Sequence, residues 1–370
     1  MTAPERVLIV GTGLIGTSVA LALRERGTRV WLSDADPATA RLAADLGAGT
    51  VIPDLRDAKG IAGIAVLAMP PAVVGRELAF AQERAVADVY TDVASVKVLP
   101  VERARELGCD LASYVPGHPL AGRERQGPAA AQADLFLGRT WALCPLPETS
   151  PDALNAVTAL AVACGADPVS TDPVTHDAWV ALVSHAPHLV AAAMAARLAP
   201  DSAPAGALRL AGPGLRDVTR VAAGDSDLWT QILSANAVPV AEVVAAVAED
   251  LAAAARLLAG LAPRTAGSGP DAPAGLTELL DRARAGVGRI PGKHGGKPRN
   301  FAVVQVVIAD RPGELARLFE AAGAAGVNIE DIRLEHSPGL PVGVAELSVR
   351  PEQVAVMVET MDAGGWPAHA

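Results

Sequence analysis

The chain has 370 residues, of which 51% are hydrophobic and 19% are charged, which is enough apolar material for two or three folded domains. Its 41 acidic and 31 basic residues give a net charge of −10, which argues against a general nucleic-acid-binding surface, because such a surface must be basic. The three scattered cysteines are too few for a disulfide framework, so we expect a cytoplasmic protein. We expect no membrane partner, because charged residues interrupt the longest apolar run, at 237–262.

Short β-branched runs alternate with helical stretches in the first part of the chain. Strands are predicted at 6–10, 29–33, 64–68, 89–92, 114–115 and 141–144 and near Val169, and helices at 14–26, 37–46 and 151–164. This alternation predicts an α/β domain over 1–172, with a parallel, doubly wound sheet of the Rossmann type.

The pattern changes twice after residue 172. Helical runs at 174–198, 214–223, 227–236, 238–261 and 276–286 predict an all-helical domain over 173–289. A basic linker rich in glycine and proline follows at 290–300. Residues 301–370 then read as strand, helix, strand, strand and helix, which predicts a small α+β domain.

A glycine-rich turn joins the first predicted strand to the first predicted helix. Its candidate cofactor-binding residues are Gly11, Gly13, Leu14, Ile15 and Gly16. The spacing is typical of a turn that lets a dinucleotide pyrophosphate approach Gly13 at the N-terminus of a helix. Asp34 ends the second strand, where a carboxylate accepts hydrogen bonds from ribose hydroxyls and repels a 2′-phosphate. We therefore predict NAD rather than NADP; the alternative is a glycine turn without a ligand.

Three polar segments follow predicted strands or open the helical domain. They are DVASVK at 92–97, GHPLAG at 117–122 and HDAWVALVSHAPH at 176–188. Lys97 in the first segment is compatible with a helix cap, a surface ion pair or a ligand contact. His185 and His188 have the spacing of half a metal site, but no cysteine or carboxylate cluster accompanies them, so we predict no metal and read His185 as a hydrogen-bonded core residue.

With GTGLIGTS and LRDVTRVAAGDSDLW, these segments occur in an order that resembles the prephenate dehydrogenase family over the first two domains. The third domain resembles an ACT regulatory domain through DRPG at 310–313 and GVNI at 326–329. The resemblance implies NAD-dependent oxidative decarboxylation of prephenate to 4-hydroxyphenylpyruvate in tyrosine biosynthesis. The C-terminal domain would then bind an amino acid, most naturally tyrosine; a purely structural module is the alternative.

The resemblance also assigns candidate residues. His118 would act on the 4-hydroxyl of the substrate, Ser95 would hydrogen-bond either His118 or that same hydroxyl, and Arg220 would hold a carboxylate. The further substrate-pocket positions are Ser184, His188, Trp229 and His176. The regulatory positions are Asp310, Gly313, Asn328 and Ile329.

One departure from the family pattern bears on substrate choice. The family commonly has Thr-Glu after the glycine at 122, whereas this chain has Arg123 and Glu124. Arg123 either adds a cation to the substrate pocket or points to solvent, so arogenate, which forms tyrosine directly, stays open as the substrate. Other enzymes of this architecture and a non-catalytic sensor are the remaining alternatives, and the intact Ser95, His118 and Arg220 favour an enzyme. The Ala-rich helices suggest a homodimer.

Overall fold

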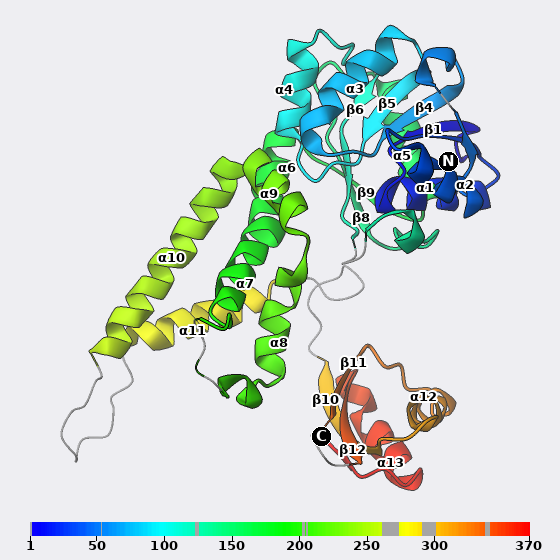
Figure 1. Cartoon of the computed structure of the whole chain (residues 1–370). Coiled ribbons are helices and arrows are strands. Elements are labelled where there is room, and N and C mark those ends of the chain that lie inside the picture. The colour runs from blue at the N-terminus through cyan, green and yellow to red at the C-terminus, as the bar shows by residue number, and fades with distance from the viewer. Residues whose placement is uncertain are drawn as a thin grey trace. The chain divides into compact units, whose positions relative to one another are not determined.

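The computed structural model describes residues 2–52, 54–122, 126–201, 204, 206–260, 274–290, 301–336 and 341–370 (Figure 1). The chain divides into two compact units, Met1–Glu249 and Asp250–Ala370. Arg123, residues 262–273 and the linker residues 291–300 lie outside the described residues. The domain borders predicted at 172, 289 and 300 stay predictions.

Six parallel strands form the central sheet of the first unit. They are β1 (Arg6–Val10), β2 (Arg29–Ser33), β3 (Thr50–Val51), β4 (Ala62–Leu67), β5 (Ala87–Asp92) and β6 (Tyr114–Val115), in the order β3-β2-β1-β4-β5-β6. The chain reverses its direction of travel across the sheet between β1 and β4, which is where open α/β sheets bind ligands at their carboxyl ends. The predicted doubly wound sheet is confirmed.

Helices cover both faces of this sheet. Helices α1 (Leu14–Glu25), α2 (Pro37–Asp45) and α5 (Pro151–Ala163) pack on one face. Helices α3 (Pro71–Glu83) and α4 (Val98–Glu106) pack on the other. The sequence pattern predicts neither α3 nor α4, because Gly75 and Pro100 weaken the helical pattern there. The structure gives the reason for the glycine: a Cβ at Gly75 would lie 2.6 Å from Cβ of Arg103, so its absence lets the two helices pack closely.

Three short strands form a separate sheet, β7 (Gly117–Pro119), β8 (Thr140–Leu143) and β9 (Asp167–Ser170), in that order. His118 lies in the middle of β7, opposite Ala142 of β8. Because β7 follows directly after β6, the chain carries His118 to the carboxyl edge of the central sheet.

The predicted helix at 174–198 is not continuous. It consists of α6 (Pro173–Val180), a π-helical turn (Ala181–His185) and α7 (Ala186–Ala196). Pro187 explains the change, because proline lacks the N–H for the helical hydrogen bond and its ring clashes with the carbonyl four residues earlier, at Val183. Helices α8 (Pro213–Thr219), α9 (Ser226–Ala235) and α10 (Ala237–Ala259) follow, with a 3-10 turn at Arg220–Ala223.

The segment Pro173–Ala196 is long and apolar enough to cross a bilayer by length and composition, and the bent pair α9–α10 passes the same test. Its buried positions include four polar side chains, however: His176, Asp177, His185 and His188. We interpret it as the core helix of a polar site. The absence of a membrane partner stays a prediction.

The second unit contains α11 (Ala274–Val287) and an antiparallel sheet. Its strands are β10 (Ala302–Ala309), β11 (Asp331–His336), β12 (Val342–Val349) and β13 (Ala368–His369), in the order β11-β12-β10-β13. Helices α12 (Glu314–Ala324) and α13 (Val354–Ala363) pack against it through one apolar core. The expected order of strand, helix, two strands and helix is present, and β13 adds a strand that the sequence analysis does not predict.

Candidate active site

The glycine turn between β1 and α1 is shaped by two close backbone contacts. A Cβ on Gly11, whose φ is +96°, would lie 2.2 Å from the carbonyl oxygen of Ala68. A Cβ on Gly16 would lie 2.0 Å from the carbonyl oxygen of Gly11. Gly13, by contrast, faces open space, which is the room that a pyrophosphate needs at the N-terminus of α1. Leu14 and Ile15, predicted with these glycines, begin α1 and pack on the core.

Asp34 follows β2 and holds this turn in place. Its Oδ2 accepts hydrogen bonds from the backbone N–H of Thr12 at 2.6 Å and from Oγ1 of Thr12 at 2.9 Å. Its Oδ1 accepts from the N–H of Asp36 at 2.9 Å. The carboxylate therefore has a structural task in addition to the ribose contact predicted from the sequence.

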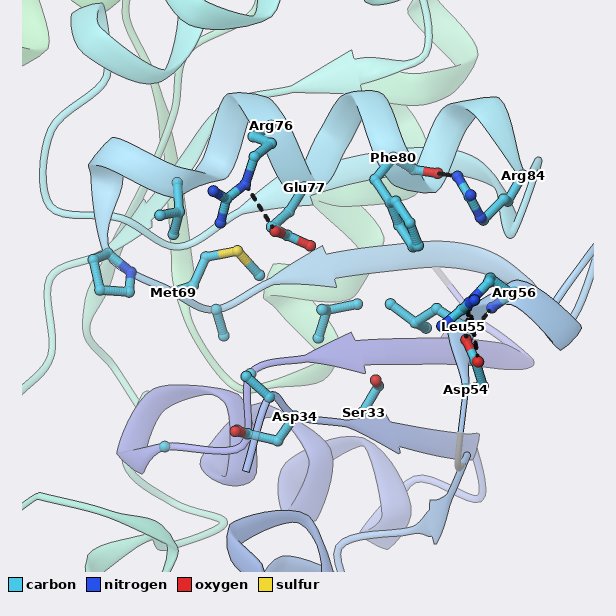
Figure 2. Close-up of a pocket in the computed structure, with 17 residues that line it drawn as sticks. Ser33, Asp34, Asp54, Leu55, Arg56, Met69, Arg76, Glu77, Phe80 and Arg84 are labelled. Atoms are coloured by element: carbon cyan, nitrogen blue, oxygen red, sulfur yellow. Dashed lines mark hydrogen bonds and ion pairs between the residues drawn. The ribbon is translucent and has the colours of Figure 1, made fainter. Parts of the chain in front are cut away.

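A cavity of about 850 Å³ opens beside the turn, and Gly11, Gly13 and Asp34 line it. Figure 2 shows Asp34 on one side and Phe80 and Arg84 of the α3 region on the other. The Arg84 guanidinium lies 3.7 Å from the centre of the Phe80 ring. A cavity of this size, with a carboxylate at one side and an open glycine turn, suits the nucleotide part of a dinucleotide. The sequence analysis misses the α3 side because it does not predict that helix.

Two histidines from different segments meet in a second group of side chains. Nδ1 of His118, on β7, lies 2.9 Å from Nε2 of His176, on α6. Nδ1 of His176 lies 2.7 Å from Oδ1 of Asp177. The Asp177 carboxylate also accepts from the backbone N–H groups of Lys97 at 2.8 Å and Val98 at 2.9 Å, so it caps α4 from another helix.

The environment of His118 keeps its imidazole neutral. Burial, and then the neighbouring His176 and Lys97, lower the pKa of His118 well below its usual value of 6.5. A neutral imidazole has one unprotonated ring nitrogen, so His118 is able to accept a proton at neutral pH.

The Lys97 side chain lies in a buried ion pair, which is not among the roles that the sequence leaves open for it. It is fully buried, forms an ion pair with Asp92 and donates to the carbonyl oxygen of Gly117, directly before His118. Asp92 also accepts from the Tyr114 hydroxyl at 2.6 Å and from the N–H of Ala94 at 2.9 Å. The pair thereby joins the loop that carries Ser95 to the strand that carries His118. The DVASVK segment contains both charges, but nothing in its spacing shows that they are buried together.

Within the described part of the chain, the structure gives no hydrogen bond between Ser95 and His118, and Nδ1 of that ring lies against His176. The role of Ser95 toward His118 or the substrate hydroxyl stays a prediction. Ser95 is only partly buried.

A second group of rings lies on the helical segment. The rings of His188 and Trp229 stack, with centroids 3.5 Å apart, and Trp229 lies edge-on to His185 at 6.2 Å. His185 is buried, with Nδ1 3.0 Å from Nδ2 of Asn236, and burial lowers its pKa to about 4. The expectation that His185 is a hydrogen-bonded core residue is confirmed. Asn236 is a further member that the sequence analysis misses.

The structure places the remaining substrate candidates at exposed positions. Ser184 lies in the π-helical turn, and Arg220 opens the 3-10 turn that follows α8. Across the described ranges, no three His, Cys, Asp or Glu side chains gather closely enough to hold a metal ion.

The predicted regulatory residues all lie in the second unit. Gly313, with φ +87°, is the N-cap residue of α12, and Asp310 is exposed just before it. Nδ2 of Asn328 donates to Oε1 of Glu330 at 2.9 Å. Ile329 lines a cavity of about 350 Å³ between α12 and β11.

Comparison with known proteins agrees with this arrangement. The chain matches the prephenate dehydrogenase nucleotide-binding domain over residues 19–169 and the prephenate dehydrogenase dimerization domain over residues 172–263. The chain belongs to the prephenate dehydrogenase family. It is 40% identical over 366 residues to the probable prephenate dehydrogenase NovF of Streptomyces niveus, covering 98% of this chain and 99% of that protein.

Two solved structures of the prephenate dehydrogenase family are also similar. A prephenate dehydrogenase from A. aeolicus, in complex with hydroxyphenyl propionate and NAD+, is 26% identical, with a TM-score of 0.65, covering 76% of this chain and 97% of that one. An arogenate dehydrogenase from Synechocystis is 27% identical, with a TM-score of 0.62, covering 76% of this chain and 98% of that one.

Proposed function

We propose that this protein is an NAD-dependent prephenate dehydrogenase that converts prephenate to 4-hydroxyphenylpyruvate. The observation that carries the proposal is the neutral His118 imidazole, held by His176 at the sheet edge where the glycine turn also lies. Membership of the family supports it.

The reaction needs one base, and His118 is suited to that role. Bound NAD supplies the acceptor for the hydride that leaves C4 of the substrate. As the hydride leaves, the unprotonated nitrogen of His118 takes the proton of the 4-hydroxyl. The resulting dienone loses its ring carboxylate as CO2, and the electrons of the broken C–C bond make the ring aromatic. The proton on His118 then returns to the phenolate oxygen.

Substrate binding is assigned to groups around this base. Arg220 holds a substrate carboxylate through its forked guanidinium, and Ser95 hydrogen-bonds the 4-hydroxyl. The stacked pair of His188 and Trp229 forms an aromatic wall of the substrate pocket, and Ser184 contributes a polar contact. Arg123, outside the described residues, adds a cation.

The test is the appearance of NADH absorbance when the protein is mixed with NAD and prephenate, with arogenate assayed in parallel. We expect a higher kcat/KM with prephenate. The similarity to the Synechocystis arogenate dehydrogenase favours arogenate as the second candidate. A higher kcat/KM with arogenate would move the assignment to that substrate, and no turnover of either would refute the proposed function.

The protein is proposed to act as a homodimer through its helical segment. The match to the family's dimerization domain supports this, and so do the exposed apolar side chains of Trp179, Leu182 and Val183 on α6 and the π-helical turn. Light scattering after size exclusion should give twice the mass of one chain, 37.6 kDa. A single-chain mass at micromolar concentration would contradict the proposal.

The C-terminal unit is proposed to be an ACT-like domain that binds tyrosine as a regulator. Its strand-helix-strand-strand-helix-strand order, the loops at 310–313 and 326–329 and the small cavity beside Ile329 support this. Regulation requires that tyrosine bind two states of the enzyme with different affinities.

A chain ending after Gly292 separates this regulation from product inhibition. The Synechocystis enzyme aligns over 98% of its length with 76% of this chain, so a shorter protein of this family folds. We expect the truncated chain to keep its activity and lose its sensitivity to tyrosine, and Asn328→Ala in the full chain to weaken that sensitivity. Equal, competitive inhibition of both lengths would place tyrosine in the active site, and no inhibition of either would leave the unit without this role.

A further inference from the structure

Asp177 is held from three directions although the proposed chemistry gives it no contact with substrate. Its carboxylate is buried and accepts from the N–H groups of Lys97 and Val98, at the first turn of α4. Its Oδ1 also lies 2.7 Å from Nδ1 of His176. The backbone of Asp177 is anchored separately, because Nδ2 of Asn236 donates to its carbonyl oxygen at 2.8 Å.

With an ionised Asp177 and a neutral His176, which the proposal takes as its starting state, these contacts determine which ring nitrogens carry protons. An ionised carboxylate only accepts hydrogen bonds, so Nδ1 of His176 must carry the proton that faces Asp177. A neutral imidazole carries one proton, so Nε2 of His176 is an acceptor. Nδ1 of His118, 2.9 Å from that nitrogen, is therefore the donor. The remaining nitrogen of His118, Nε2, is left unprotonated.

We propose that Asp177 is a positioning residue that acts through His176 to set the tautomer of His118, so that Nε2 of His118 is the nitrogen that accepts a proton. That this proton comes from the substrate hydroxyl rests on the proposed function. When Nε2 takes that proton, Nδ1–H of the resulting imidazolium stays bonded to His176, whose own N–H points to the Asp177 carboxylate. The negative charge of Asp177 then stabilises the positive charge that develops on His118.

Asp177→Asn tests this with almost no change of shape. The amide has only one oxygen, and the backbone anchor through Asn236 is kept. With its NH2 group toward His176, the amide donates to Nδ1 of His176. Nε2 of His176 then carries the proton and donates to Nδ1 of His118, so the proton of His118 lies on Nε2. We expect kcat to fall by about 10²-fold or more, as when the aspartate of a catalytic triad is replaced, while the NAD Kd and the KM for prephenate change by less than about threefold.

Asp172→Asn is the matched control. Asp172 caps α6, the helix that carries Asp177, by accepting from the N–H groups of Val174 and Thr175 at 3.0 Å, but no hydrogen bond joins its side chain to His176. Its replacement should leave kcat unchanged. An equal loss of kcat in both variants would mean that the placement of α6, and not the tautomer, matters, and would overturn the proposal.

The ¹⁵N NMR spectrum of the imidazoles measures the tautomer directly, without substrate. The signals of His118 are assigned by comparison with His118→Asn. We expect the full-length protein to show His118 protonated at Nδ1 at neutral pH, and Asp177→Asn to shift it toward Nε2. Protonation at Nε2 in the unchanged protein, or a folded Asp177→Asn with unchanged kcat, would overturn the proposal. If the unchanged protein does not turn over prephenate, the proposed function fails, but the spectrum still decides the role of Asp177.

Discussion

Replacing the buried Lys97 with methionine should destabilise the nucleotide-binding sheet strongly. Lys97 and Asp92 are both fully buried, so removing one partner leaves the charge of the other inside the protein without its counter-charge. Removing one partner of a buried ion pair costs about 3–5 kcal/mol. The Tyr114 hydroxyl and the N–H of Ala94 still donate to Asp92, which favours the lower part of that range. The Gly117 carbonyl oxygen, however, loses its donor, which adds about 1 kcal/mol or more. We therefore expect a loss of about 4 kcal/mol.

Hydrogen exchange of the peptides that carry β4 and β5 measures this loss in the sheet itself, separately from the C-terminal unit. Arg105→Met is the control, because Arg105 and Glu148 form a pair in which both side chains are about half exposed. That change should cost less than about 1 kcal/mol. Adding Asp92→Asn to Lys97→Met should recover part of the loss, since it removes the uncompensated charge. A loss below about 1 kcal/mol for Lys97→Met would refute the reasoning that the pair is buried and coupled.

Four further predictions concern catalysis and binding. The lowered pKa of His118 keeps its ring unprotonated above about pH 6.5, so kcat should stay level from about pH 8 to pH 6.5 and fall only at lower pH; an acid limb near pH 7 would assign the titration to another group. His118→Asn should lower kcat by about 10²–10⁴-fold in the NADH assay, and an unchanged kcat would remove it from the mechanism. Arg220→Ala should raise the KM for prephenate about 10²-fold, with only partial recovery in Arg220→Lys; full recovery would make the forked geometry unnecessary. Asp34→Ala should weaken NAD binding more than NADP binding in calorimetry, and preferential NADP use by the unchanged protein would contradict that role.

Local patterns determined much of the fold. The alternation of β-branched runs and helices predicts the parallel sheet, and the glycine spacing with Asp34 predicts the nucleotide turn, because both depend on residues close together in the chain. The helices α3 and α4 escape this reasoning. Gly75 reads as a helix breaker in the sequence, whereas in the structure it permits a close contact between two helices.

Motif order predicted that His118 and His176 belong to one site, but not how they bond. The sequence contains Asp92 and Lys97 in one segment and His176 and Asp177 in another, 79 or more residues apart. Only the tertiary structure shows that Asp177 caps a helix from the first domain and that His118 faces His176 rather than Ser95. Hydrogen-bond direction and charge burial depend on distances between segments that are far apart in sequence, and local propensity carries no information about those distances. The sequence therefore identified the family and its candidate groups, and the packing of α6 against β7 and α4 decided their chemistry.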